Sequence, residues 1–284
     1  MKTSPITGAT QVYGILGHPV AHSFSPVMQN VAFRSRKMDA VYVAYDVAPS
    51  QLEKAIDGIR ALNIQGLNIT VPHKAAVLDY LDEVTPTAKK IGAVNTIKQE
   101  QGRLIGTNTD GLGFLQSLQE MQFTPKDQCI ALLGAGGSAR SILVSLAEAF
   151  VQRILIVNRT PEKAKQLMVE FAPLFPQTKI EAVPMDQMKS ESIDLLINTT
   201  TVGMKEVATP VPLEECRQVR CVVDIIYSPR ETLLLKQARL RGLPFINGIG
   251  MLLCQGGAAF EFWTGRPAPL EQMRSALIQH LAEA

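Results

Sequence analysis

The sequence predicts an α/β fold in two domains. Short apolar runs alternate with longer amphipathic runs, which is the pattern of strands and helices in α/β architecture. A length of 284 residues fits two domains of roughly 150 residues each. A glycine-rich turn follows one apolar run and opens an amphipathic one, which is typical of a doubly wound nucleotide-binding domain.

In the first part of the chain, apolar runs predict strands at 12–16, 41–47 and 66–71. Amphipathic runs predict helices at 26–37 and 50–62, the second with Ser50 as its N-cap. Strands at 93–98 and 103–107 would form a hairpin around Gln101–Gly102. A helix is then expected from Gly111 to about Gln122, ending before Pro125.

A second, more regular series begins at Cys129. It predicts strands at 129–133, 153–157, 180–183, 193–198, 222–226 and 244–247. Helices are expected from the glycine loop to about residue 150, at 161–171 and at 232–241, and 251–284 is interpreted as two helices separated at 265–267. We therefore expect one domain at 1–110, completed by C-terminal helices at 248–284, and another at 111–247.

Composition narrows the classes of partner. The 28 basic and 26 acidic residues leave a net charge of +2, and the basic clusters are small and scattered, so nucleic acid is not an expected partner. The first ten residues lack the apolar region of a secretory signal. The most apolar stretch, 130–150, contains Arg140 and Glu148, which argues against a membrane span. A cytoplasmic location and small-molecule partners are expected, and a homodimer is left open.

The sequence does not predict a metal site. The four cysteines have no C-x2-C spacing, and free thiols are the expected state. His18 and His22 have a metal-like spacing, but Pro19 between them prevents the regular helix that would bring them together.

The segment from Gly134 to Ala139 matches the G-x-G-x-x-G/A pattern of dinucleotide-binding turns. Gly134 permits the tight turn, Gly136 lets the backbone approach a pyrophosphate, and the small Ala139 lets the helix pack close to the sheet. The start of that helix offers N–H groups and a positive dipole end to phosphate. The residues expected to contact the cofactor here are Gly134, Ala135, Gly136, Gly137 and Ser138.

The end of the next strand indicates which dinucleotide binds. NAD sites usually carry Asp or Glu there, whereas this chain continues with Asn158, Arg159 and Thr160, and has Lys163 shortly afterwards. The planar guanidinium of Arg159 can donate two parallel hydrogen bonds to a phosphate, whereas Lys163 lacks that geometry. The alternative is that Arg159 is a surface residue without a ligand. The missing acid favours NADP as the cofactor, bound by these four residues.

Several polar segments of the first domain stand at strand ends and helix starts. Ser23 and Ser25 precede an expected helix, and polar groups alternate along 68–74, which leaves a strand. Asn95 and Asp110 lie in similar polar turns. Each segment alone is also explained as a cap or a turn.

Together these segments resemble the signature of the shikimate dehydrogenase family over nearly the whole chain. The motifs, in order, are S-x-S-P from Ser23, N-x-T-x-P-x-K from Asn68, G-A-V-N-T from Gly92, G-x-N-T-D-G from Gly106, the glycine loop, Asn158-Arg159-Thr160, Asn198-Thr199-Thr200, Asp224-x-x-Tyr227-x-Pro229 and Gly250-Met251-Leu252-x-x-Gln255. So many motifs in the same order are a specific signal.

The resemblance implies NADPH-dependent, reversible reduction of 3-dehydroshikimate to shikimate, a step of aromatic amino acid biosynthesis. It also implies an N-terminal α/β substrate domain, a Rossmann-like NADP-binding domain and an active site in the cleft between them. By motif match, Ser23 and Ser25 would bind the substrate carboxylate, and Lys74 would be the catalytic lysine. The other expected contacts are Thr70, Asn95, Asp110, Tyr227 and Gln255 with the substrate, and Ile225 and Gly248 with the nicotinamide side of the cofactor.

The chemistry of ketone reduction assigns roles to one pair. The alkoxide that forms needs a proton and a nearby positive charge, which a protonated lysine supplies. Pro72 predicts that Lys74 lies in the first turn of a helix, whose dipole favours the neutral amine, whereas Asp110 would favour the ammonium. The sequence leaves that balance open. We expect Lys74 to be the general acid and Asp110 to orient it, with the two side chains meeting across the gap between the domains.

Three alternatives remain. Many members of the family have M-H-N where this chain has Met28-Gln29-Asn30, and the chain's variant occurs in the quinate/shikimate branch. The nearest alternative is therefore an NAD(P)-linked quinate/shikimate dehydrogenase with broader substrate use. A silent NADPH-binding sensor could lose Lys74 or Asp110, but both are present. A methylene-folate dehydrogenase could share the two-domain arrangement but gives no reason for Ser23 and Ser25.

Overall fold

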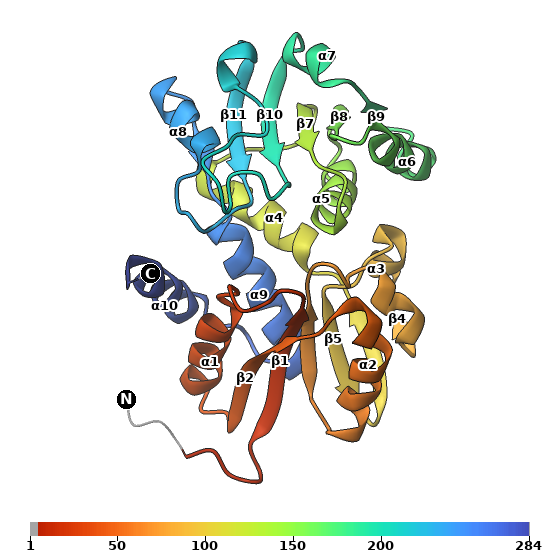
Figure 1. Cartoon of the computed structure of the whole chain (residues 1–284), viewed down its shortest axis with the longest axis vertical. Coiled ribbons are helices and arrows are strands. Elements are labelled where there is room, and N and C mark those ends of the chain that lie inside the picture. The colour runs from red at the N-terminus through yellow and green to blue at the C-terminus, as the bar shows by residue number, and fades with distance from the viewer. Residues whose placement is uncertain (1–4, 284) are drawn as a thin grey trace. The chain divides into compact units, whose positions relative to one another are not determined.

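Residues 5–283 are described by a computed structural model, in which the chain divides into two compact units (Figure 1). The N-terminal unit comprises 1–110 and 253–284, and the nucleotide unit comprises 111–252. The nucleotide unit ends inside helix α9 (Ile249–Thr264), whereas the sequence predicted that the C-terminal part of the first domain begins at 248. The first turn of α9 stays with the nucleotide unit because Gly250 lies against Ser117 and Glu120.

The N-terminal unit is built on a mixed six-stranded sheet in the order β2-β1-β3-β5-β6-β4. β1 pairs in parallel with β2 and β3, β5 is antiparallel to β3 and β6, and β4 is parallel to β6. The strands are β1 (Gln11–Gly17), β2 (Ala40–Asp46), β3 (Gly66–Ile69), β4 (Glu83–Val84), β5 (Thr96–Glu100) and β6 (Arg103–Thr107). The helices are α1 (Ser25–Ser35), α2 (Leu52–Ala61), α3 (Pro86–Ile91) and α10 (Leu270–Glu283), with 3-10 turns at Pro49–Gln51 and Ala76–Tyr80.

Helices α2 and α9 both pack against this sheet. The apolar stripe of α2, with Ile56 and Ile59 fully buried, packs in a cluster with Leu67 and Ile97. Trp263, near the end of α9, donates its indole N–H to the Ile97 carbonyl at 2.9 Å. A Cβ at Gly66 would lie 2.6 Å from the Trp263 ring, so the strand approaches this helix as closely as only glycine permits.

The nucleotide unit contains a six-stranded sheet in which every strand pair is parallel. Its order, β12-β11-β10-β7-β8-β9, is the 3-2-1-4-5-6 order of doubly wound dinucleotide-binding domains. The strands are β7 (Cys129–Leu133), β8 (Arg153–Val157), β9 (Lys179–Ala182), β10 (Ile193–Asn198), β11 (Val219–Asp224) and β12 (Phe245–Ile246). The helices are α4 (Asp110–Leu118), α5 (Gly137–Glu148), α6 (Pro161–Phe171), α7 (Met185–Lys189) and α8 (Leu233–Leu240), with 3-10 turns at Gln119–Met121, Ala172–Leu174 and Leu213–Glu215.

The structure corrects two local predictions and adds three short elements. Ser50 is not an N-cap, because Pro49–Gln51 forms a 3-10 turn and α2 begins at Leu52 without a side-chain cap. The residues after Pro72 form a turn followed by the 3-10 helix Ala76–Tyr80, so Lys74 does not start an α-helix. The short elements β4, α3 and α7 were not predicted. They contain two, six and five residues, too few for a periodic pattern to stand out.

Two features of residues 5–283 bear on the class of protein. None of the helices there has both the length and the apolar character needed to cross a membrane. In the same residues, no three His, Cys, Asp or Glu side chains gather as metal ligands would.

Candidate active site

Lys74 and Asp110 meet in the N-terminal unit. Lys74 Nζ lies 2.5 Å from Asp110 Oδ2, and the two side chains are 12% and 6% exposed. The turn that carries Lys74 is held by the backbone, because its carbonyl accepts a hydrogen bond from the Val94 N–H at 2.7 Å. The pair therefore forms within one unit, and the prediction that it spans two domains was wrong. With no α-helix at Lys74, the dipole that would oppose the ammonium is also absent there.

Asn95 holds the other oxygen of the same carboxylate. Its Nδ2 donates to Asp110 Oδ1 at 2.7 Å, and its Oδ1 accepts from the Thr109 N–H at 2.8 Å. The Asp110 N–H in turn donates to Asn108 Oδ1 at 3.0 Å. Each of these residues is buried, and a buried, fully paired polar group has little freedom to move. The carboxylate is therefore fixed from both of its oxygens.

A second branch of the network runs from Asn95 toward the N-terminus of α1. Asn68 Nδ2 donates to the Asn95 carbonyl at 3.2 Å, and Asn68 Oδ1 accepts from the Tyr42 hydroxyl at 2.7 Å. Tyr42 also forms a hydrogen bond with Ser25. Burial raises the pKa of Tyr42 well above its usual value, against the opposing effect of Ser25, so the hydroxyl stays neutral. Ser25 is thus connected through buried groups to the Lys74–Asp110 pair.

The remaining predicted substrate residues of this unit are Ser23, Thr70 and Gln255. Ser23, half-buried, accepts a hydrogen bond from the Ser25 N–H through its Oγ at 3.3 Å. Thr70 follows β3, and its methyl group would lie 2.3 Å from a Cβ at Gly17, so the two chain segments are in close contact. Gln255 on α9 is 9% exposed, and its carbonyl accepts from Thr109 Oγ1 at 3.1 Å.

The glycine loop has the geometry that the motif predicts. Gly134 adopts φ +112°, and a Cβ there would lie 2.4 Å from Thr199 Oγ1. Both the backbone conformation and the lack of space therefore exclude a larger residue. Gly136 caps α5, and a Cβ there would meet no atom within 4 Å. Gly137 and Ser138 form the first turn of α5, where N–H groups have no partner within the helix. Ala135 is half-buried between the two glycines.

The predicted 2′-phosphate residues lie together after β8. Asn158 is half-buried, and its Nδ2 donates to the Thr160 carbonyl at 2.9 Å, which closes the turn before α6. Arg159, Thr160 and Lys163 are exposed. Within residues 5–283, Arg159 forms no ion pair, so its guanidinium is available to an anion. No acidic residue stands in the segment 158–160.

The third predicted group, Ile225, Tyr227 and Gly248, belongs to the nucleotide unit. Ile225 and Tyr227 are half-buried in the segment that follows β11. The Gly248 N–H donates to the Ile226 carbonyl at 3.0 Å. A Cβ at Gly248 would lie 1.9 Å from the Ile225 carbonyl oxygen, so the backbone of this segment rests directly on Gly248.

Sequence reasoning missed several residues of these networks. Asn68 and Thr109 stood in quoted motifs but had no assigned role. Tyr42 lies in a strand of ordinary apolar and aromatic composition, and nothing in its neighbourhood in the sequence marks its hydroxyl. Only the pairing of β1 with both β2 and β3 brings Tyr42 to Asn68.

Gln29, the residue that departs from the common family pattern, is fully buried on α1. Its Nε2 donates at 2.8 Å to the carbonyl of Gly256, the neighbour of Gln255. Its Oε1 is buried without a hydrogen-bond partner in the part of the chain that the structure describes. Gln29 therefore binds the backbone next to a predicted substrate residue.

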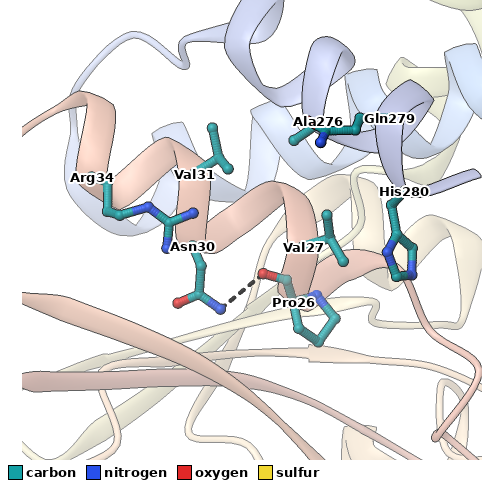
Figure 2. Close-up of a pocket in the computed structure, with 8 residues that line it drawn as sticks. All are labelled: Pro26, Val27, Asn30, Val31, Arg34, Ala276, Gln279 and His280. Carbon is teal, nitrogen blue, oxygen red and sulfur yellow. Dashed lines mark hydrogen bonds between the residues drawn. The ribbon is translucent and has the colours of Figure 1, made fainter. Parts of the chain in front are cut away.

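A groove of about 470 Å³ lies elsewhere in the N-terminal unit, between α1 and α10 (Figure 2). Arg34 and His280 contribute its charged and ionisable side chains, and Val27 and Val31 contribute apolar ones. Asn30 also lines the groove, but its Nδ2 already donates to the Pro26 carbonyl at 2.8 Å (Figure 2). None of the predicted site residues lines this groove.

Family models match most of the chain in three consecutive parts. The shikimate dehydrogenase substrate binding domain matches residues 15–97, and the shikimate/quinate 5-dehydrogenase model matches 117–232. The shikimate 5′-dehydrogenase C-terminal domain matches 248–278. The matched segments include the Lys74 turn, the glycine loop and Gln255.

Individual relatives resemble the chain over almost its full length. Shikimate dehydrogenase (NADP(+)) of Symbiobacterium thermophilum is 46% identical over 99% of this chain and 98% of its own. A crystal structure of a shikimate dehydrogenase in complex with NADP+ is similar with a TM-score of 0.91 and 43% identity, covering 98% of both chains. The Thermus thermophilus shikimate 5-dehydrogenase in complex with NADP(H) and shikimate has a TM-score of 0.86 at 37% identity, covering 95% of this chain and 99% of the other.

Proposed function

Because this chain belongs to the shikimate dehydrogenase family, we propose that it catalyses the reversible, NADPH-dependent reduction of 3-dehydroshikimate to shikimate. The observation that carries the proposal is the 2.5 Å contact between Lys74 and Asp110, buried beside Asn95. A positive charge held at one place by a fixed carboxylate suits a reaction that develops negative charge on a carbonyl oxygen.

The nucleotide unit fits NADP. Gly136 leaves open space, and the first turn of α5 supplies N–H groups for the pyrophosphate. The exposed Arg159, with no acid beside it in 158–160, suits the 2′-phosphate, and Asn158, Thr160 and Lys163 complete that end of the site. When bound, NADPH supplies the hydride that goes to the carbonyl carbon of the substrate.

Lys74 donates the proton that the reduction requires. As the carbonyl oxygen gains negative charge, the Nζ–H bond breaks and the proton passes to that oxygen, leaving a neutral amine beside Asp110. Asp110 orients the amine through Oδ2, and Asn95 holds Asp110 Oδ1 so that the carboxylate cannot turn away. In the oxidation of shikimate the same amine accepts the hydroxyl proton.

The other predicted residues bind the substrate around this pair. Ser23 and Ser25 bind its carboxylate, and the Ser25 hydroxyl is held by its hydrogen bond with Tyr42. Thr70, Gln255 and Tyr227 contact the polar ring, and Ile225 and Gly248 contact the nicotinamide side of the cofactor. The location of the whole site in the cleft between the domains stays a prediction.

The cellular setting belongs to the same proposal. All four cysteines are free, as thiols are in a reducing compartment, which supports a cytoplasmic location. The near balance of charge supports small molecules rather than nucleic acid as partners. A homodimer stays a prediction.

The purified protein, assayed with shikimate or quinate and with NADP or NAD, tests the proposal. Nicotinamide reduction should be fastest with shikimate and NADP. Comparable rates with quinate would assign the chain to the quinate/shikimate branch, with Gln29 the first residue to exchange. Activity with none of the four pairs would overturn the proposed function.

A further inference from the structure

Two motif residues without a role in the proposed reaction, Asn198 and Asp224, meet in the nucleotide unit. Asn198 ends β10, Asp224 ends the neighbouring β11, and both side chains are fully buried. Asn198 Nδ2 donates to Asp224 Oδ1 at 3.0 Å. Buried polar groups of this kind cost folding free energy unless all of them are paired. The other hydrogen bonds of Asn198 and Asp224 therefore decide whether the pair is stable.

Asp224 also connects the segment after β11 to helix α8. Its Oδ1 accepts a second hydrogen bond from the Ile226 N–H at 3.1 Å. Its Oδ2 accepts from Thr232 Oγ1 at 2.6 Å, and Thr232, 1% exposed, is the N-cap of α8. One carboxylate therefore binds a strand end, a loop amide and a helix cap.

Asn198 makes the corresponding connection on the other side. Its Oδ1 accepts from the Thr200 N–H at 3.0 Å and from Thr200 Oγ1 at 2.7 Å. The intervening Thr199 donates through both N–H and Oγ1 to the carbonyl of Leu133, at 2.8 and 2.7 Å. Leu133 leads directly into Gly134, so the loop after β10 is attached to the glycine turn.

These bonds surround the segment predicted to contact the nicotinamide. In doubly wound sheets the ligand binds outside the carboxyl ends of the strands, where the strand order reverses. Here that point lies between β7 and β10, with β11 adjacent. Ile225 and Tyr227 extend from β11, and the backbone of Ile225 and Ile226 rests on Gly248.

We infer that Asn198, Asp224 and Thr232 are positioning residues, a polar lock that holds the segment from Ile225 to Tyr227 in the geometry needed for hydride transfer. The inference rests on the proposed function. The three side chains are at most 1% exposed, so the lock acts through that segment. Because a misplacement of about 1 Å can cost about 10²-fold in rate, loosening it should lower kcat more than it weakens cofactor binding.

A matched pair of substitutions tests the lock. Thr232→Val removes the hydroxyl that Asp224 binds. Thr178→Val removes an equally buried hydroxyl, which donates to the Val151 carbonyl at 2.8 Å just before β9, away from the lock. Both changes keep the side-chain shape, but Thr232→Val also removes the cap that Thr232 Oγ1 provides to the Leu235 N–H. Melting temperatures show how far each variant is destabilised, so that the loss of the cap is accounted for.

Thr232→Val should lower kcat by about 10-fold or more while the Kd for NADP stays within about 3-fold. Thr178→Val should keep kcat within about 2-fold of wild type, and Thr232→Ser, which restores the hydroxyl, should recover most of the loss. Equal kcat in the two valine variants, or no recovery by serine, would overturn the inference. If Thr232→Val does not fold, Thr232→Cys, a weaker donor, replaces it with the same expected order.

Hydrogen exchange separates failure of the lock from failure of the proposed function. If the wild-type protein does not oxidise shikimate with NADP, the function is wrong, and the lock is judged by amide exchange alone. Amides in 225–231 should exchange at least about tenfold faster in Thr232→Val than in Thr178→Val, since local opening there becomes easier. Equal exchange rates in that segment would overturn the lock.

Discussion

Lys74 Nζ and Asp110 Oδ2 lie 2.5 Å apart although 36 positions separate the two residues in the chain. Both side chains are largely buried, and the second oxygen of Asp110 is occupied by Asn95. A buried ion pair of this kind costs desolvation free energy, which well-formed hydrogen bonds must offset. The arrangement is therefore what a reaction needing a fixed ammonium would use, and it is open to direct tests.

Lys74→Ala should lower turnover by about 10²–10⁴-fold, because the alkoxide loses its proton donor. The Kd for NADPH should change little, since the glycine loop and Arg159 belong to the nucleotide unit. Steady-state kinetics and fluorescence titration measure the two quantities. Lys89→Ala, at an exposed position of α3, serves as the control for loss of a lysine. Near-normal turnover in Lys74→Ala would refute the role.

Arg159→Ala should weaken NADP binding by about 10–100-fold, the value of one or two charge-assisted hydrogen bonds. NADH binding should be nearly unchanged, because NADH has no 2′-phosphate, so the preference for NADPH should collapse. Kd values for both cofactors measure this. Lys165→Ala, which removes an exposed charge from α6, the helix that follows Arg159, is the control. A preserved preference for NADPH would contradict the assignment of Arg159.

Asp224→Asn should change how stability depends on pH. Burial raises the pKa of Asp224 from its usual 3.8 to about 6, against the opposing hydrogen bonds from Thr232, Ile226 and Asn198. Burial therefore favours the protonated carboxyl, and the stability that this contributes is present below about pH 4 and lost as pH rises through about 6. The difference between the two values corresponds to roughly 3 kcal/mol.

The variant has no charge to bury at this position. Urea denaturation between pH 4 and 7 should therefore show that the free energy of unfolding of Asp224→Asn rises by roughly 2–3 kcal/mol relative to wild type as pH increases. Most of this change should be complete by about pH 6. Asp79→Asn, which removes an exposed carboxylate, is the control and should follow the wild-type profile closely. A constant difference between wild type and Asp224→Asn across this range would disprove the prediction.

Gly248→Ala and Gly58→Ala should have opposite effects on stability. A Cβ at Gly248 would lie 1.9 Å from the Ile225 carbonyl oxygen, so the segment after β11 must move, at a cost of about 1–3 kcal/mol or more. Gly58 lies within α2, where a Cβ would meet no atom within 4 Å, and alanine there should stabilise by about 0.5–1 kcal/mol. Melting temperatures should move in opposite directions, and a stable Gly248→Ala variant with normal kcat would rule out the close contact.

Local patterns were enough for much of the nucleotide unit. Strands at 129–133, 153–157 and 193–198 and a helix at 161–171 were predicted with the bounds that the structure has. These strands belong to a parallel sheet, so they form continuous apolar runs bounded by turn residues. The glycine turn and Pro161 at the first position of α6 are equally local signals. Patterns failed where elements were short, as at β4, α3 and α7, and at Pro72, where a turn replaced the expected helix.

By itself, the sequence determined the α/β class, the nucleotide turn, the missing acid after Val157 and the identity of the polar residues in each motif. Only the tertiary structure decided that Lys74, Asn95 and Asp110 share one buried network and that Asn198, Asp224 and Thr232 share another. The physical reason is range: backbone preferences act over a few residues, whereas these contacts depend on the pairing of strands and loops from distant parts of the chain. Tyr42 and Thr232 show this most clearly, because their hydroxyls acquire a role only when packing places an acceptor next to them.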